Sequence, residues 1–300
     1  MINWFLLSLI AILFWSGSDL FSKIGAKPDD IYSHWKMVMA VGLVMGVHAF
    51  YMLAIGTPFS LTDIITYLPA SVCYIASMII GYAGLRYIEL SISSPVCNSS
   101  GAVAAVLGVL FLHATMTGLQ VLGVVLVCAG VFALSVIQKR KDDALRAAEG
   151  YTPDAKHTRG LFAITFPILY CIIDGLGTFV DGVLLDTAAV IAEEQANIAY
   201  ELTFLMMGIF AFVYAVLIKK APLTIPTEGP KLLGALCETA GQFAYIYAIG
   251  ANMVVAAPMI SSYCVASLLW SRIFLKEKLS KAQYAVIAVA AAGIVILGME

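Results

Sequence analysis

Apolar residues run through this chain in blocks of about twenty, separated by short polar stretches. A block of that length forms a helix long enough to cross the hydrocarbon core of a bilayer. The composition agrees, because 61% of the 300 residues are hydrophobic and 12% are charged. A soluble domain has roughly 45–50% apolar and about 25% charged residues. The sequence therefore predicts an all-α integral membrane protein and excludes a soluble globular one.

Reading the blocks between polar breaks predicts ten transmembrane helices. They span residues 3–22, 36–55, 63–87, 93–112, 117–137, 160–181, 195–218, 231–250, 253–273 and 280–298. The first block is expected to be retained rather than cleaved as a signal peptide, because it lacks a basic n-region and has Asp19 and Lys23 in place of a cleavage site. The longest polar segment divides the chain into a first five-helix half (1–137), a cytoplasmic linker (138–159) and a second half (160–300).

All 17 Lys and Arg residues fall on one side of this ten-helix scheme. The loops of the other side carry acidic residues and no basic one: Asp63, Asp181, Asp186, Glu193 and Glu194. Lys and Arg concentrate on the cytoplasmic side of membrane proteins. We therefore expect a multi-pass protein of the cell (inner) membrane with both termini outside the cytoplasm.

Part of the first half repeats in the second. Residues 92–134 align without a gap on residues 255–297, which lie 163 positions later. The matched pairs are Pro95 with Pro258, Phe111 with Phe274, Leu112 with Leu275, Gln120 with Gln283, Gly130 with Gly293 and Leu134 with Leu297. The first helix aligns less firmly with the sixth. Because each half has an odd number of spans, the pattern predicts two inverted five-helix repeats, which place a site near the membrane midplane where the halves meet.

These features resemble the drug/metabolite transporter (DMT) superfamily, in particular its ten-helix EamA-like branch. The resemblance rests on the five plus five helices, on Trp15–Lys23 and on the repeated helix pair, including the stretch FLKEKLSKAQYAVIAVAAAGIVIL. The first half departs from this stretch, since His113 and Ala114 stand where the second half has Lys276 and Glu277. The resemblance implies metabolite transport without ATP, through a cavity lined by helices one to four and six to nine, with helices five and ten as scaffold. The absence of a GxxxxGK[ST] loop agrees that no nucleotide drives it.

Ionisable side chains inside the predicted spans indicate a candidate site. Each costs about 2.5–3.5 kcal/mol at bilayer depth, so it usually faces a cavity or a partner. Glu238 is the deepest, and Gln242 and Tyr245 share its helical face at i+4 and i+7. The candidate substrate-binding residues are Glu238, Gln242, Tyr245, Asp174, Tyr170, Trp15, Asp19, Tyr74, Asn98 and Tyr263.

Structural roles remain open for some of these side chains. Asp19 lies four residues from Lys23, which could pair with it. Glu201 lies near the outer end of its helix, where capping, bridging to another helix or snorkelling to an interface is favoured over a cavity role. Any single Tyr or Trp is more often packing than a ligand contact. The four His residues are scattered, and none of the six Cys has CxxC spacing. We therefore expect no metal site, no disulfide and no cofactor.

The sequence leaves several functions open. No Lys or Arg reaches the middle third of a predicted helix, whereas carboxylates and aromatic rings at that depth suit a cation. The first hypothesis is a secondary transporter of a small organic cation or zwitterion, such as a choline-like compound, an amine or an amino acid. Glu238 would bind its charge or exchange a proton, since a desolvated carboxylate protonates more readily. The alternatives are a flippase or exporter of lipid-linked metabolites, a passive channel, and an enzyme. The scattered His residues disfavour an enzyme, and nothing indicates a nucleic-acid partner.

Overall fold

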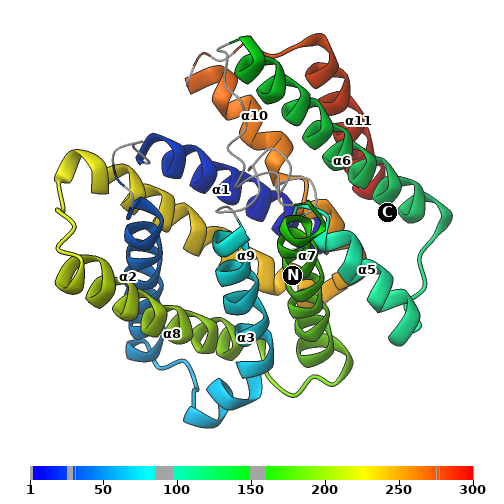
Figure 1. Cartoon of the computed structure of the whole chain (residues 1–300). Helices are drawn as coiled ribbons and strands as arrows, with labels where there is room; N and C mark the ends of the chain where they lie inside the picture. The colour runs from blue at the N-terminus through cyan, green and yellow to red at the C-terminus, as the bar shows by residue number, and fades with distance from the viewer. Residues whose placement is uncertain are drawn as a thin grey trace.

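The computed structural model describes residues 3–25, 30, 32–84, 97–148, 160–274, 276 and 278–299. Within these ranges the chain forms helices and turns and no strand. The helices are α1 (Trp4–Gly25), α2 (Ser33–Ala54), α3 (Leu61–Gly84), α5 (Ser100–Phe111), α6 (Gly118–Ala148), α7 (Gly160–Gly182), α8 (Glu193–Phe212), α9 (Ile225–Ile260), α10 (Tyr263–Phe274) and α11 (Lys281–Leu297) (Figure 1). Two π-helical turns, η1 (Val183–Thr187) and η2 (Val213–Ile218), extend α7 and α8.

The predicted all-helical, apolar architecture is confirmed in the described residues. Five helices are long and apolar enough to cross a membrane: Trp4–Ser22, Ser33–Ala54, Thr165–Thr187, Glu193–Ile218 and Glu228–Ile260. Shorter apolar helices cover Leu61–Ser77, Ser100–Phe111, Gly118–Leu134, Tyr263–Phe274 and Lys281–Leu297. Each of these segments overlaps a predicted span, and Glu228–Ile260 overlaps both the eighth and the ninth. Ten spans in two inverted repeats, and the division of the chain into halves and linker, remain predictions.

The predicted boundary between the eighth span (231–250) and the ninth (253–273) coincides with a break in helical geometry. Helix α9 is kinked at Asn252, whose φ of −166° and ψ of 79° are not helical, so Ile225–Ile260 consists of two helices joined at this residue. A further break, at the turn Ser261–Ser262, lies inside the predicted ninth span and was not expected. Hydropathy does not reveal this break, because the apolar pattern is continuous across it. Pro95 lies outside the described residues.

The repeat seen in the sequence has a counterpart in local structure. Both α5 and α10 have 12 residues, and their first residues are 163 positions apart. A two-residue turn precedes each, at Asn98–Ser99 and at Ser261–Ser262. After each, one residue adopts a positive φ, 52° at His113 and 55° at Lys276. The first half has His113 where the second half has Lys276, and this difference therefore changes the side chain but not the backbone conformation.

The next helices begin alike as well. The backbone N–H of Thr117 donates to Gln120 Oε1 (3.0 Å), and the N–H of Gln120 donates to Thr117 Oγ1 (3.1 Å). Ser280 and Gln283 exchange the same two bonds at 2.8 and 3.2 Å. These reciprocal caps stabilise the first turns of α6 and α11. The matched Gln residues of the sequence therefore have the same structural role.

Helices α6 and α11 lie side by side at one edge of the bundle (Figure 1). A Cβ added to Gly123 would meet the Leu297 side chain at 2.7 Å, and one added to Gly130 would meet Ala290 at 2.9 Å. A Cβ on Gly293 would meet the Gly123 carbonyl oxygen at 2.8 Å. A residue nearer the C-terminus of α6 thus contacts a residue nearer the N-terminus of α11, so the two helices run antiparallel. Glycine allows this close approach because it has no side chain.

The other helices pack around α9 and against one another. Helix α1 contacts α9 and α10, α7 contacts α3 and α5, and α2 contacts α8. In α9, 78% of the apolar segment is buried, against 28–39% in the other four long segments. Helix α9 is therefore the centre of the bundle. The apolar outer faces of the surrounding helices, such as Leu43, Val47 and Phe50 on α2, stay exposed and suit contact with lipid.

A buried ion-pair cluster joins the α1–α2 connection to the start of α9. We use this name for Asp30, Lys36, Glu228 and Lys231. Lys36 Nζ lies 2.9 Å from Asp30 Oδ2 and 3.6 Å from Glu228 Oε1, and Lys231 Nζ lies 3.5 and 3.3 Å from carboxylate oxygens of the same two residues. Lys36 also donates to the Pro222 carbonyl (2.7 Å). Two lysines counted above among the loop charges are therefore buried structural groups.

Candidate functional site

A cavity of about 180 Å³ lies between the helices that surround α9. That volume has room for on the order of ten non-hydrogen atoms. Its lining comprises Trp15, Asp19, Tyr74, Cys97, Asn98, Ser100, Gly101, Tyr170, Asp174, Thr178, Tyr200, Glu238, Gln242, Tyr245, Ala257, Ile260, Ser261 and Tyr263. All ten candidate residues from the sequence are among them. The structure thus brings these ten side chains together from five helices (α1, α3, α7, α9 and α10) and the Asn98 turn; their role in binding remains a prediction.

The lining helices agree with the resemblance in part. Helices α6 and α11, at the positions of the fifth and tenth predicted spans, contribute no described residue to the lining, as expected of a scaffold. Helix α2 contributes none either, although the resemblance implied that helix two lines the cavity.

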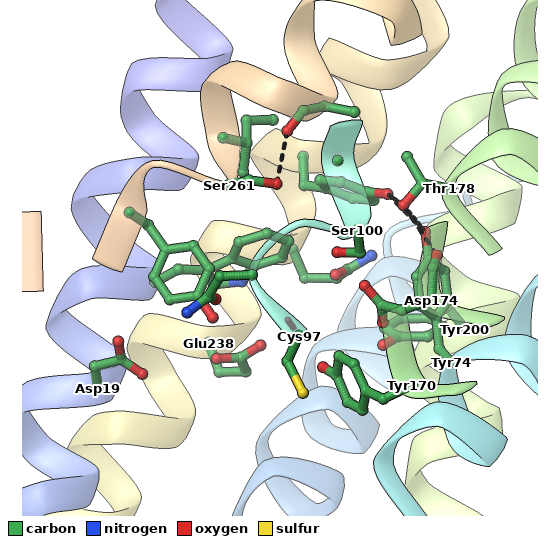
Figure 2. A pocket seen from close by; sticks show the side chains of 18 residues that line it. Asp19, Tyr74, Cys97, Ser100, Tyr170, Asp174, Thr178, Tyr200, Glu238 and Ser261 are labelled. Atoms are coloured by element: carbon green, nitrogen blue, oxygen red, sulfur yellow. Dashed lines mark hydrogen bonds between the residues drawn. The ribbon is translucent and has the colours of Figure 1, made fainter. Parts of the chain in front are cut away.

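Three carboxylates face the cavity from two sides. Asp19 of α1 and Glu238 of α9 lie on one side, and Asp174 of α7 lies on the other among tyrosines (Figure 2). Asp19 is exposed, so it lies where the cavity opens. Its Oδ2 accepts a hydrogen bond from Ser267 Oγ of α10 (2.7 Å). Glu238 is half-buried.

Aromatic rings form much of the remaining lining. The Trp15 ring lies 5.1 Å from the Tyr245 ring and 5.8 Å from the Tyr263 ring, measured between centroids. The Trp15 ring also packs against Gly241, where an added Cβ would lie 2.4 Å from Trp15 Cδ1. A larger residue at 241 would displace the indole ring from its place beside the cavity. Tyr74 and Tyr200 meet edge to face at 5.8 Å on the Asp174 side.

Two N–H donors of the lining are buried without a partner, Trp15 Nε1 and Gln242 Nε2. Buried polar groups are normally hydrogen-bonded, and an unpaired one costs about 1–3 kcal/mol. Both residues line the cavity. They could therefore donate hydrogen bonds to an acceptor atom of a bound molecule.

A buried carboxylate, Asp181, lies directly behind the lining and is surrounded by hydroxyl groups. Asp181, near the end of α7, is fully buried. Tyr67 of α3 donates to its Oδ1 (2.6 Å), and Tyr74 donates to its Oδ2 (2.7 Å). The Tyr74 hydroxyl oxygen lies 2.6 Å from that of Tyr245, which in turn donates to Thr178 Oγ1 (2.9 Å). We call these five residues the tyrosine–aspartate network.

Sequence reasoning missed Asp181, because it placed this residue with the acidic loops of the outer side. A signal was present: Asp174, Thr178 and Asp181 follow one another at i, i+4 and i+7 and so share one face of α7. The lining residues Tyr200 and Cys97 were also missed. Tyr200 stands beside Glu201 in an apolar helix and carries no distinguishing pattern.

Glu201 does not line the cavity. It is fully buried between α2 and α8, and its Oε1 lies 2.7 Å from His48 Nδ1. Its other carboxylate oxygen and both amide atoms of Asn197, one turn earlier, have no partner. Of the structural roles expected for this residue, the contact with His48 is the bridging one, since it links two helices. Among the described residues no group of His, Cys, Asp or Glu could hold a metal ion.

Comparison with known proteins points to one family. Residues 2–136 match the EamA-like transporter family. An uncharacterized protein of Methanocaldococcus jannaschii is 29% identical over 135 residues, which cover 44% of this chain and 95% of that protein. A protein known from its crystal structure matches 99% of this chain and 96% of its own, with a TM-score of 0.70 and 14% identity. Identity that low shows a shared fold and nothing of function.

The family match confirms the resemblance found in the sequence. Together with the apolar helices, the match points to a multi-pass membrane protein and suggests transport of small molecules. Residues 2–136 are thus similar to the EamA-like transporter family, which belongs to the drug/metabolite transporter superfamily.

Proposed function

We propose that the protein is a secondary transporter of a small organic cation or zwitterion that binds in this cavity and crosses the membrane by alternating access. The observation that carries the proposal is the lining itself. It contains Asp19, Asp174 and Glu238 with several aromatic rings, and no Lys or Arg among the described lining residues. Carboxylates attract a cation, and ring faces add cation–π attraction that strengthens in a desolvated site.

Two inverted halves would give alternating access around a fixed site. The equal lengths of α5 and α10, their matched turns and the antiparallel contact of α6 with α11 support this arrangement. The M. jannaschii relative supports it too, because a protein about half as long as this chain corresponds to one such unit. The proposed units are residues 1–137 and 160–300, joined by a cytoplasmic linker at 138–159.

Each lining group has a distinct role in this proposal. Asp174 and Glu238 hold the ammonium group from opposite sides, and Trp15 and Tyr263 cover it with ring faces. Trp15 Nε1 and Gln242 Nε2 donate to the acceptor end of a zwitterion or an amino alcohol. The flippase alternative has one observation in its favour: Asp19 is exposed and bonded to Ser267 of α10, so a headgroup could enter between α1 and α10.

The binding test is a thermal-shift screen of the purified protein with amines, amino acids and nucleosides, followed by titration of the strongest ligand. Trp15→Leu removes the ring face and should weaken binding by up to about 2 kcal/mol, or roughly thirtyfold. The control is Trp35→Leu, because Trp35 packs against Phe210 and Tyr214 away from the cavity. Equal affinity for the ligand and its neutral carbon isostere would reject a cation site and favour the lipid alternative.

The coupling test concerns Glu238, which we propose exchanges a proton during transport. Glu238→Gln keeps the shape and removes the titratable group. In proteoliposomes this variant should lose accumulation against a gradient or its pH dependence, while exchange of labelled for unlabelled ligand continues. Uphill transport with unchanged pH dependence would show that this carboxylate is structural.

The orientation also belongs to the proposal. The distribution of Lys and Arg supports a cell (inner) membrane protein with both termini outside the cytoplasm. A C-terminal fluorescent protein that folds only in the cytoplasm should stay dark, and a phosphatase fusion at the same site should be active. The opposite pair of results would reverse the assignment of sides.

A further inference from the structure

The two hydrogen bonds to Asp181 fix the direction of the hydroxyl groups around it. One tyrosine hydroxyl lies against each carboxylate oxygen, Tyr67 at 2.6 Å and Tyr74 at 2.7 Å. In both bonds the tyrosine hydroxyl is the donor and a carboxylate oxygen of Asp181 is the acceptor. Tyr74 therefore uses its one hydroxyl hydrogen in the bond to Asp181.

This first bond determines the bonds that follow. The Tyr74 and Tyr245 oxygens are 2.6 Å apart, and Tyr74 has no second hydrogen, so Tyr245 is the donor between them. Its alternative acceptor is Thr178 Oγ1 at 2.9 Å. Thr178 in turn donates to the carbonyl oxygen of Asp174 (3.3 Å). Each choice uses the hydroxyl hydrogens inside the network and leaves none for the cavity.

The consequence is a cavity side that can only accept hydrogen bonds. Tyr74, Thr178 and Tyr245 line the cavity together with the Asp174 side chain, and we call these four residues the acceptor wall. An ammonium group with N–H hydrogens satisfies this wall, with charge-assisted bonds to the carboxylate. A quaternary ammonium carries the same charge but no N–H, so it leaves buried acceptors facing methyl groups at a cost in binding.

We propose that Asp181, one layer behind the lining, sets the hydrogen-bond polarity of the acceptor wall, so that the cavity selects ammonium groups that carry N–H hydrogens over quaternary ones. This rests on the proposed function, and it narrows the ligand class by disfavouring choline-like compounds. Asp181 is a positioning residue, because it is not part of the lining and acts through Tyr74. A hydroxyl that donates to a carboxylate also becomes a stronger acceptor.

Charge alone would predict a different result. A buried negative charge near the cavity attracts primary and quaternary ammonium groups alike, whereas the acceptor wall distinguishes them. The ratio of the two affinities therefore reports polarity and is insensitive to a purely electrostatic or structural role. Suitable probe pairs are ethanolamine with choline and glycine with glycine betaine, titrated into the purified full-length protein by calorimetry.

Asp181→Leu is the main variant, because leucine has a similar size and no acceptor, so no bond to residue 181 fixes the direction of the Tyr74 hydroxyl any longer. Asp181→Asn is the second variant, for use if the leucine protein does not fold. Tyr67→Phe is the matched control: it removes the bond to the other oxygen of Asp181, and Tyr67 does not line the cavity. The thermal-unfolding profile of each variant checks that it is folded.

The wild type should bind the N–H member of a pair about ten- to a hundredfold more tightly. The Asp181 variant should reduce that ratio to within about threefold, and Tyr67→Phe should preserve it. Equal wild-type affinities within each pair would overturn this inference and leave the proposed function standing. A ratio that survives in a folded Asp181 variant would overturn the role of Asp181. If the wild type binds no member of either pair, the proposed function fails and this inference with it.

Discussion

The ion-pair cluster and the tyrosine–aspartate network both join the first part of the chain to the second, but they neutralise charge differently. In the cluster, two carboxylates face two ammonium groups at 2.9–3.6 Å. In the network, the Asp181 carboxylate accepts from two tyrosine hydroxyls, and no Lys or Arg of the described residues pairs with it. The cluster includes Lys36, in the first turn of α2, whereas the network includes Tyr67 and Tyr74 of α3.

Because of this difference, we expect the ion-pair cluster and the tyrosine–aspartate network to have different roles. Paired charges cancel, so the cluster leaves little field beyond itself and serves mainly to hold the start of α9 against the α1–α2 connection. An unpaired buried carboxylate is solvated by hydroxyl dipoles and imposes its polarity on them. The network therefore extends the influence of Asp181 into the cavity through Tyr74. Disrupting the cluster should change stability, and disrupting the network should also change ligand preference.

The largest effect is expected for Lys231→Met in the ion-pair cluster. Lys231 is almost fully buried, at 1% exposure. Removing one partner of a buried ion pair typically costs about 3–5 kcal/mol, because a charge is left without compensation. The measurement is the unfolding temperature in detergent, with the exposed Lys278→Met as control. Ligand affinity ratios should be unchanged in the folded protein; an unfolding temperature equal to that of the control would contradict a stabilising role.

A smaller loss of stability is expected for Tyr67→Phe in the network. The change keeps the ring, which packs edge to face on Tyr200 at 6.4 Å, and deletes the donor to Asp181 Oδ1. Leaving a buried acceptor unpaired costs about 1–3 kcal/mol. Thermal unfolding should show this loss while the Tyr74 bond keeps the acceptor wall intact. A shift in the preference for N–H ligands would mean that Tyr67, too, controls the wall.

Acid should weaken the cluster through Asp30. Partial burial raises the pKa of Asp30, but the hydrogen bond from Lys36 and the charges of Lys36 and Lys231 outweigh it and lower the pKa below its usual value. A group with a lowered pKa stabilises the fold fully above its unfolded pKa of about 3.9, and that contribution is lost as the pH falls through the folded value. The stability difference between wild type and Asp30→Asn should therefore be constant near neutral pH and shrink below about pH 4. A difference that does not change down to pH 3 would exclude this linkage.

Most of the helical arrangement could be predicted from the sequence, because a bilayer requires long apolar blocks and these are visible in the residues themselves. The shift of 163 positions also predicted which helices would correspond, and the caps at Thr117 and Ser280 follow it. The kink at Asn252 lies at the expected boundary between the eighth and ninth spans, but the break at Ser261 could not be predicted in the same way. It depends on local backbone angles, which hydropathy does not record.

The composition of the cavity was predictable to the extent that polar groups recur at helical spacing. Glu238, Gln242 and Tyr245 showed that spacing and do lie together in the lining. Asp181 showed it as well, but its place at the end of a predicted span concealed it. The direction of its hydrogen bonds depends on Tyr67 and Tyr74, more than 100 positions earlier in the chain, and no local pattern connects those residues.

The smallest expected effect is the coupling between the two regions. Lys231→Met and Tyr67→Phe alter groups that share no hydrogen-bond or ion-pair partner among the described residues. Changes at sites without shared partners usually add to within about 0.3–0.5 kcal/mol. The double variant should accordingly lose the sum of the two single losses in thermal unfolding. In a transporter that opens alternately to each side, however, breaking one connection would favour a state in which the other is tightened. A double variant that is destabilised by more than the sum, beyond about 0.5 kcal/mol, would therefore reveal that the cluster and the network act as opposing gates rather than as independent contacts.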